Sequence, residues 1–255
     1  MQQESFVAAL KGSAALVGTL VSVRSPEVAE ALALSGFDWL FVDMEHSPID
    51  AAAAHAILQA VAGRALVALR LPSNSPEHFK QALDAGGDAV IVPMVNTAEE
   101  TRAAVGAAKY PPLGARGAGI GRAHGYGVDF AGYVERANSS IAVIVQIEHI
   151  QAVENIDEIL AVEGLDAVFL GPYDLSGSMG LLGQVAHPDV IAAMDRVRVA
   201  CARVGMPWGI FCATTEKAAE EMERGARFVV AGSDLSLMMS AAVGSLRALG
   251  RPAQR

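Results

Sequence analysis

Two carboxylates in the second half of the chain are the residues best suited to bind a metal ion. Glu148 ends the apolar run IAVIVQIE, and Asp174 follows the apolar run LDAVFLG. A carboxylate beside a buried strand is costly without a counter-charge, and the backbones of neighbouring strands stand about 5 Å apart. Ligation by oxygen alone favours Mg²⁺ or Mn²⁺ over Zn²⁺. Two protein ligands would leave about four of the six octahedral positions for water and substrate.

A simpler explanation exists for either carboxylate alone. Acids in the first turn of a helix are stabilised by the helix dipole, and both residues stand where a helix could begin. The occurrence of both, at the ends of neighbouring strands, favours the metal site.

Two further side chains are suited to act on a substrate bound there. His46 follows Asp43 and Glu45, and an imidazole held by a carboxylate is a good general base near neutral pH. Arg70 ends another apolar run and would stabilise an anionic substrate or a developing enolate. The simpler roles are helix capping for His46 and a structural ion pair with Asp43 or Glu45 for Arg70.

The segment GPYD offers backbone groups rather than side chains. Pro172 has no N–H, but the amides of Gly171 and Tyr173 on either side of it could bind a carboxylate. A Gly-Pro pair is also an ordinary turn signal.

These residues belong to an alternation of strands and helices that runs from end to end. Eight short apolar runs without period-two alternation predict strands covered on both faces. They span residues 16–23, 38–43, 65–71, 88–94, 141–148, 165–171, 207–211 and 227–232. Helix-like segments with Pro or capping residues at their starts lie between them, at 26–36, 48–63, 75–87, from 97 onward, and at 149–160, 187–205, 214–225 and 233–249.

Eight strand-plus-helix units in 255 residues predict a (β/α)8 TIM barrel. No linker composition divides the chain, so one domain over residues 1–255 is expected. A doubly wound sheet is the alternative, but it usually has a glycine-rich turn after the first strand, which is missing here. In a barrel the active site lies at the C-terminal ends of the strands. Ser233 or Asp234 is expected to cap the last helix.

Composition excludes several other classes of protein. The formal net charge is -9 with no basic stripe, which argues against a nucleic-acid or anionic-membrane partner, and every long apolar run is interrupted. Cys201 and Cys212 are too few for a disulfide framework or a cysteine zinc site, and no signal-peptide pattern opens the chain, so a cytoplasmic protein is expected. Lys109 and Lys217 fall on helix-like segments, which argues against Schiff-base chemistry.

The chain resembles the HpcH/HpaI aldolase family from about residue 10 to 245. The motifs FDWLFVDMEHSP, ALRLP, KYPPLGARGAG, VQIEH and LGPYDLS occur in the family's order. The resemblance implies a class II pyruvate aldolase, which cleaves a 4-hydroxy-2-oxo acid reversibly to pyruvate and an aldehyde. Its cofactor would be Mg²⁺ or Mn²⁺, with Co²⁺ a further candidate.

The resemblance also implies roles for the side chains. Glu148 and Asp174 would bind the metal, which pyruvate would chelate through its carboxylate and keto oxygens. Arg70 would contact the keto oxygen and stabilise the enolate. His46, oriented by Asp43, would shuttle the proton through a metal-bound water.

Substrate binding and assembly complete what the resemblance implies. Gln146 would line the site, and the amides of Gly171 and Tyr173 would hold the pyruvate carboxylate. Family barrels are typically hexamers that exchange the last helix between neighbours, and the apolar stretch 235–248 is compatible with this arrangement.

Differences from the family bear on the aldehyde and on the alternatives. The first strand lacks the Trp that several members carry. Loop residues, including the Gly- and Pro-rich segment 110–128 or a neighbouring subunit, are expected to choose the aldehyde. The same site would also suit a decarboxylase or a CoA-thioester lyase, although the acidic charge weighs against CoA. A catalytically silent barrel is disfavoured because Glu148, Asp174, Arg70 and His46 are all present.

Overall fold

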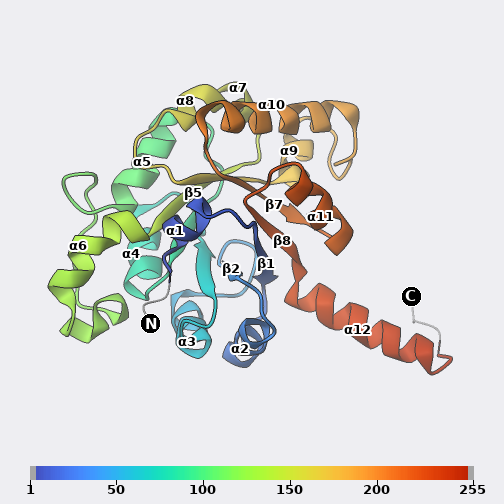
Figure 1. The fold of residues 1–255 in the computed structure, drawn as a ribbon, viewed down its shortest axis with the longest axis horizontal. Helices are drawn as coiled ribbons and strands as arrows, with labels where there is room; N and C mark the ends of the chain where they lie inside the picture. The colour runs from blue at the N-terminus through green and yellow to red at the C-terminus, as the bar shows by residue number, and fades with distance from the viewer. Residues whose placement is uncertain (1–3, 252–255) are drawn as a thin grey trace.

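Eight parallel strands close into a barrel with helices around it in the computed structural model, which describes residues 4–251 (Figure 1). Each strand pairs with the next in sequence, and β8 pairs with β1 to close the ring. The strands are β1 (Leu16–Val21), β2 (Trp39–Asp43), β3 (Leu66–Arg70), β4 (Ala89–Val92), β5 (Ala142–Ile147), β6 (Ala167–Leu170), β7 (Trp208–Cys212) and β8 (Phe228–Ser233). The predicted (β/α)8 barrel is confirmed, with one strand in each predicted run.

The helices largely follow the prediction. Within the described residues they are α1 (Phe6–Lys11), α2 (Pro26–Leu34), α3 (Ala51–Val61), α4 (Pro76–Asp84), α5 (Ala98–Ala108), α6 (Phe130–Ser140), α7 (Ile150–Glu154), α8 (Ile156–Leu160), α9 (Pro172–Ser178), α10 (Pro188–Val204), α11 (Thr215–Glu223) and α12 (Asp234–Ala248), with a 3₁₀ helix at Arg122–Gly127. The single helix expected at 149–160 is two short ones that meet at Asn155. Helices α1, α6 and α9 have no counterpart in the prediction.

Alternate residues of the strands point into the barrel, where aromatic rings fill the interior. Trp39 and Phe228 pack with ring centres 5.7 Å apart, and Phe41 and Phe169 at 5.4 Å. The outward residues are equally apolar because helices cover them, as expected for parallel strands. The inward positions turn polar where strands end: Asp43, Arg70 and Gln146 come two residues after the inward Phe41, Ala68 and Ile144. This C-terminal end of the strands is the mouth of the barrel.

The opposite end of the barrel repeats one three-residue pattern before β2, β4, β6 and β8. The four segments are Gly36-Phe37-Asp38, Gly86-Gly87-Asp88, Gly164-Leu165-Asp166 and Gly225-Ala226-Arg227. The glycines have φ from 88° to 100°, a conformation that favours glycine. An Oδ2 of each aspartate accepts the N–H of the preceding strand at 2.8 Å, from Val17, Val67 and Val143 respectively. These carboxylates therefore tie the starts of strands together in pairs.

Arg227 replaces the aspartate in the fourth segment and holds α1 against the barrel. Its guanidinium donates to four carbonyls at and after the end of α1, those of Leu10, Gly12, Ser13 and Ala14. Helix α1 inserts Phe6 against the interior rings, 5.7 Å from Trp39. The helix thus closes the end of the barrel at which the strands start.

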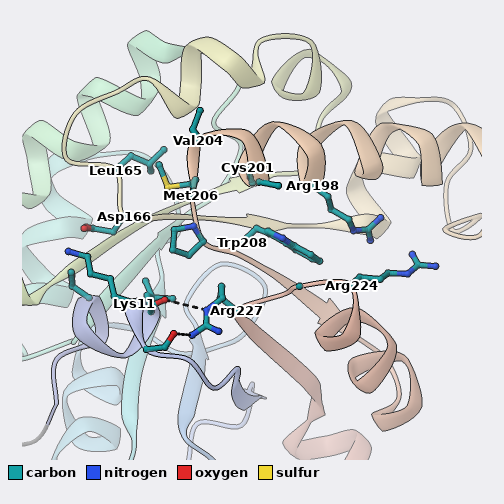
Figure 2. Close-up of a pocket in the computed structure, with 17 residues that line it drawn as sticks. Lys11, Leu165, Asp166, Arg198, Cys201, Val204, Met206, Trp208, Arg224 and Arg227 are labelled. Atoms are coloured by element: carbon teal, nitrogen blue, oxygen red, sulfur yellow. Dashed lines mark hydrogen bonds between the residues drawn. The ribbon is translucent and has the colours of Figure 1, made fainter.

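A cleft of about 800 Å³ lies beside α1 at this same end (Figure 2). Its three arginines already have partners: Arg198 pairs with Glu221 at 2.8 Å and Arg224 with Glu221 at 3.6 Å, while Arg227 binds the carbonyls after α1. The cleft is therefore part of the structural framework, at the opposite end from the polar strand ends.

The segment 110–128 also lies at this end. Arg122 donates to the carbonyls of Leu58 and Ala85, at the C-terminal ends of α3 and α4, at 3.1 and 3.0 Å. Arg116 pairs with Asp84, the last residue of α4, at 2.7 Å. The expectation that this segment chooses the aldehyde is therefore wrong for the segment's own barrel, because helix C-termini and strand C-termini lie at opposite ends.

Helix α12 extends away from the barrel instead of covering it (Figure 1). Among its fifteen residues, all described, Asp234 alone is buried. Leu235, Met238, Met239 and Leu246 are each between 44% and 59% exposed. An apolar helix face is thus left without a partner in the single chain.

No helix within residues 4–251 combines the length and apolar character needed to cross a membrane.

Candidate active site

Arg70 and Asp43 form a two-point ion pair at the mouth. Arg70 Nε lies 2.9 Å from Asp43 Oδ1, and one terminal guanidinium nitrogen lies 2.9 Å from Oδ2. The two residues are paired in register on β2 and β3. Burial alone would raise the pKa of Asp43, but the bonds from Arg70 and from two loop amides hold that pKa below its usual range. Asp43 is therefore an anion that fixes the guanidinium in one orientation.

Two more contacts confine Arg70. The guanidinium carbon lies 5.2 Å from the centre of the Phe41 ring, on the interior side. Nε is also 3.3 Å from Glu45 Oε2. Burial opposes the charged form of Arg70, yet the negative charges of Asp43, Glu45 and Glu148 raise its pKa. A permanently charged donor group is thus held at the edge of the mouth.

His46 stands on the loop after β2 with its side chain 65% exposed. Its ring Nε2 lies 3.7 Å from Glu45 Oε2. Asp43, which the sequence resemblance assigned to orient the ring, instead accepts the backbone N–H groups of Glu45 and His46 at 3.0 and 3.2 Å. The expected ring contact with Asp43 is therefore replaced by one with Glu45, because Asp43 is fully used by Arg70 and the loop backbone.

Glu148 follows β5 and is 4% exposed. Its Oε1 accepts the N–H of Met94 at 2.7 Å, and its Oε2 accepts from the side-chain amide of Gln146. Burial raises the pKa of Glu148 to about 7; the Met94 amide opposes this shift, while the charges of Glu45 and Asp174 add to it. The negative charges of Glu45 and Asp174 thus add to that of Glu148 at the mouth.

A divalent cation fits these groups. The donor set is made of carboxylate and amide oxygens, as hard cations prefer, and the buried Gln146 Oε1 has no hydrogen-bond partner in the described chain. No three His, Cys, Asp or Glu side chains within residues 4–251 converge to hold an ion by themselves. A cation bound by Glu148 and Asp174 would therefore take its other ligands from water and substrate.

The segment after β6 differs from the prediction in one backbone group. The amide of Gly171 donates to the carbonyl of Ile147 at 3.1 Å, so it is not free to bind a carboxylate. The amides of Tyr173 and Asp174, in the first turn of α9, have no intrahelical partner. Gly171 matters for its lack of a side chain: a Cβ there would stand 2.8 Å from Glu148 Cβ.

The match to known proteins agrees with this arrangement of groups. A family model described as HpcH/HpaI aldolase/citrate lyase matches residues 17–241. This chain belongs to that family. A 2-dehydro-3,6-dideoxy-6-sulfogluconate aldolase from Pseudomonas putida is 46% identical, over 96% of this chain and 96% of the relative. A 4-hydroxy-2-oxo-heptane-1,7-dioate aldolase from Shigella sonnei is 41% identical, over 94% and 92% respectively.

Solved structures support the same family assignment. The crystal structure of an HpcH/HpaI aldolase/citrate lyase family protein from Burkholderia cenocepacia superposes with a TM-score of 0.91 and 36% identity. The match covers 94% of this chain and 96% of that one. The barrel fold is thus shared along nearly the whole length of both chains.

Sequence reasoning missed three apolar residues at the mouth of this HpcH/HpaI barrel. Leu20 packs against the interior cluster near the end of β1. Phe211, on β7, is 36% exposed although Ile210 and Cys212 beside it are buried against the helices, so Phe211 points to the mouth. Met94, after β4, is 50% exposed and has φ 54°. Alternation of inward and outward residues along each strand could have identified these three. Because both faces of the strands are apolar, that alternation is not visible in the sequence.

Proposed function

We propose that this chain is a divalent-metal-dependent aldolase, which cleaves a 4-hydroxy-2-oxo acid reversibly to pyruvate and an aldehyde. The observation that carries the proposal is a buried carboxylate, Glu148, that shares the mouth with a guanidinium, Arg70, whose orientation Asp43 fixes. A 2-oxo acid needs both kinds of group, because its keto oxygen gains negative charge when the carbon–carbon bond breaks.

The residues that would hold the metal are Glu148 and Asp174. Their oxygens suit Mg²⁺ or Mn²⁺, with Co²⁺ a further candidate. When bound, the ion would supply Lewis-acid polarisation of the keto group. Met94 and Gln146 hold the two oxygens of Glu148 in place, so the carboxylate is oriented before the ion arrives.

Arg70 would stabilise the charge that develops on the keto oxygen. Its guanidinium is anchored on one edge by Asp43, and it rests on Phe41. A fixed donor of this kind costs little reorganisation during the reaction. The substrate carboxylate would bind at the start of α9, where the amides of Tyr173 and Asp174 are free of intrahelical bonds.

His46 would remove the proton of the 4-hydroxyl group in the cleavage direction. The imidazole is exposed at the mouth and lies 3.7 Å from Glu45, which would orient the ring. In the synthetic direction the same group would return the proton to the aldehyde oxygen.

The first test is deuterium exchange at the methyl group of pyruvate, followed by NMR. Exchange should require Mg²⁺ or Mn²⁺, stop with EDTA and be lost in Glu148→Ala. His46→Ala should slow it, whereas His55→Ala on α3 should not. Absence of exchange with every metal in folded protein would contradict the pyruvate assignment.

We also propose that α12 packs on a second copy of the chain, in a homo-oligomer that the family resemblance makes a hexamer. The support is the exposed apolar face of α12. Light scattering should give a multiple of the 26.5 kDa chain mass, and Met238→Glu with Met239→Glu should lower it. A monomeric wild type would contradict this proposal.

A reducing, cytoplasmic location is supported by Cys201 and Cys212, which are unpaired and buried.

A further inference from the structure

The first turn of α12 is hydrogen-bonded to the residues that follow β1, at the place where β8 pairs with β1 and closes the barrel. Asp234 is 5% exposed, and its Oδ2 accepts the backbone N–H groups of Ser22 and Val23 at 2.8 and 2.7 Å. Its Oδ1 accepts from Ser22 Oγ at 2.6 Å and from the N–H of Leu235 at 2.8 Å. Ser233 already caps α12, so Asp234 is not needed as the cap.

The end of β8 is shaped to place this carboxylate. The pairing of β1 with β8 shifts register between Gly18 and Leu20, and Gly232 has φ 70°. Such an irregularity re-aims the side chains that follow it. The hydroxyl of Thr19 donates to the carbonyl of Gly232 at 3.3 Å, which ties the irregularity to β1.

Ser22 lies at the mouth, level with Asp43. Val21 is in register with Val42, so the next residues along the two strands are Ser22 and Asp43. Ser22 comes two residues after Leu20, which packs against the interior cluster. In a closed ring of eight strands β1 stands opposite β5, which carries Glu148 at its end.

We propose that Asp234 is a positioning residue that holds the end of β1 as the aldehyde side of the active site. The inference rests on the proposed aldolase function. If β3, β5 and β6 hold the pyruvate part of the substrate, the aldehyde part extends across the mouth toward the wall formed by β1, which stands opposite β5, and β7, which stands opposite β3. Leu20 and Phe211 reach the mouth from that wall, and Asp234 fixes its β1 half.

A carboxylate suits this position because all four of its partners are donors. An asparagine of the same size would turn one oxygen into an N–H₂ donor, which would face the Ser22 and Val23 amides or the Ser22 hydroxyl. Asp234→Asn therefore loosens the loop while leaving the residues at β3, β5 and β6 in place.

The test compares two readouts on the metal-loaded, full-length enzyme. Cleavage of 4-hydroxy-2-oxopentanoate, the aldol of pyruvate and acetaldehyde, should show a KM raised about ten-fold or more in Asp234→Asn, as the loss of charge-assisted bonds predicts. Deuterium exchange of pyruvate alone should stay within about two-fold of wild type. Hydrogen exchange should show that the Ser22 and Val23 amides lose protection.

Two matched variants complete the design. Asp189→Asn removes an exposed acid from the first turn of α10 and should change neither readout. Ser22→Ala removes one donor and should raise KM less than Asp234→Asn, which keeps the inference testable if Asp234→Asn does not fold. Equal loss of cleavage and pyruvate exchange in Asp234→Asn, or an unchanged KM, would overturn the inference. Absence of exchange in the wild type would overturn the proposed function and the inference with it.

Discussion

The backbone amide of Met94 donates to Glu148 Oε1 at 2.7 Å from a residue whose φ is 54°. Few residues other than glycine adopt this left-handed conformation, and those that do are often found at functional sites. Met94, in the turn after β4, therefore adopts an unfavourable backbone conformation. In this conformation its amide holds one oxygen of the buried Glu148 carboxylate at the mouth.

Neutralising Glu148 should stabilise the metal-free protein and abolish stabilisation by metal. The folded-state pKa of about 7 lies above the ordinary value, so at pH 8 the ionised carboxylate destabilises the metal-free fold. Glu148→Gln should raise the metal-free Tm by roughly 2–4 °C. Adding Mn²⁺ should raise the Tm of wild type but not of the variant. The exposed Glu154→Gln serves as the control, and a metal-induced rise that survives in Glu148→Gln would contradict the site.

Replacing Arg70 by lysine should keep the charge and lose the geometry. A lysine ammonium cannot make the two parallel bonds that Arg70 makes with Asp43. Cleavage of a 4-hydroxy-2-oxo acid and pyruvate deuterium exchange should both fall roughly a hundred-fold. Arg64→Lys, on the surface after α3, is the matched control. Steady-state kinetics with wild-type rates for Arg70→Lys would show that only the charge matters.

Truncating the Phe211 side chain should weaken binding of the aldehyde and leave binding of pyruvate unchanged. Phe211 is the one exposed residue of β7, whose other four residues are buried, and it lies on the wall opposite β3. In Phe211→Ala the KM for acetaldehyde in the synthetic direction should rise about ten-fold. The KM for pyruvate should stay near its wild-type value, and a change in both would show that the wall is shared.

Folding stability should fall as the pH rises from about 4 to about 6 because of Asp88. Burial raises the pKa of Asp88 to about 6, against the opposing effects of the Val67 amide and Arg122. The unfolded group titrates near its ordinary value of about 3.9, so between these values the folded protein binds more protons. Urea unfolding of wild type and Asp88→Asn at several pH values isolates this contribution. Parallel profiles for the two proteins would refute it.

The fold was predictable because the apolar runs and glycine stops mark every strand. Helix α1 was not, because six residues with one capping serine carry little periodicity. The place of segment 110–128 depends on long-range bonds such as that of Arg122 to Leu58, which no local pattern reveals.

The candidate site was predictable in its residue types and less so in its contacts. Strand-end positions placed Asp43, Arg70 and Glu148 at one end of the barrel. That the Gly171 amide is used by Ile147 follows from pairing between β5 and β6, which sequence does not specify atom by atom. The importance of Asp234 depends on a register shift, a feature equally invisible in the residue order.

Carboxylates have different roles at the two ends of the barrel. The aspartates of the repeated Gly-x-Asp segments join the starts of strands, whereas the carboxylates at the mouth belong to the candidate active site. Those that join strand starts stand about 17 Å, a five-residue strand, from those at the mouth. Three pairs of strands, β1–β2, β3–β4 and β5–β6, are thus each closed by an aspartate, whereas Arg227 at the equivalent place before β8 binds the end of α1 instead. Substitutions that alter substrate preference at the mouth leave these closures untouched, which makes the scaffold well suited to evolve new aldehyde specificities without losing its fold.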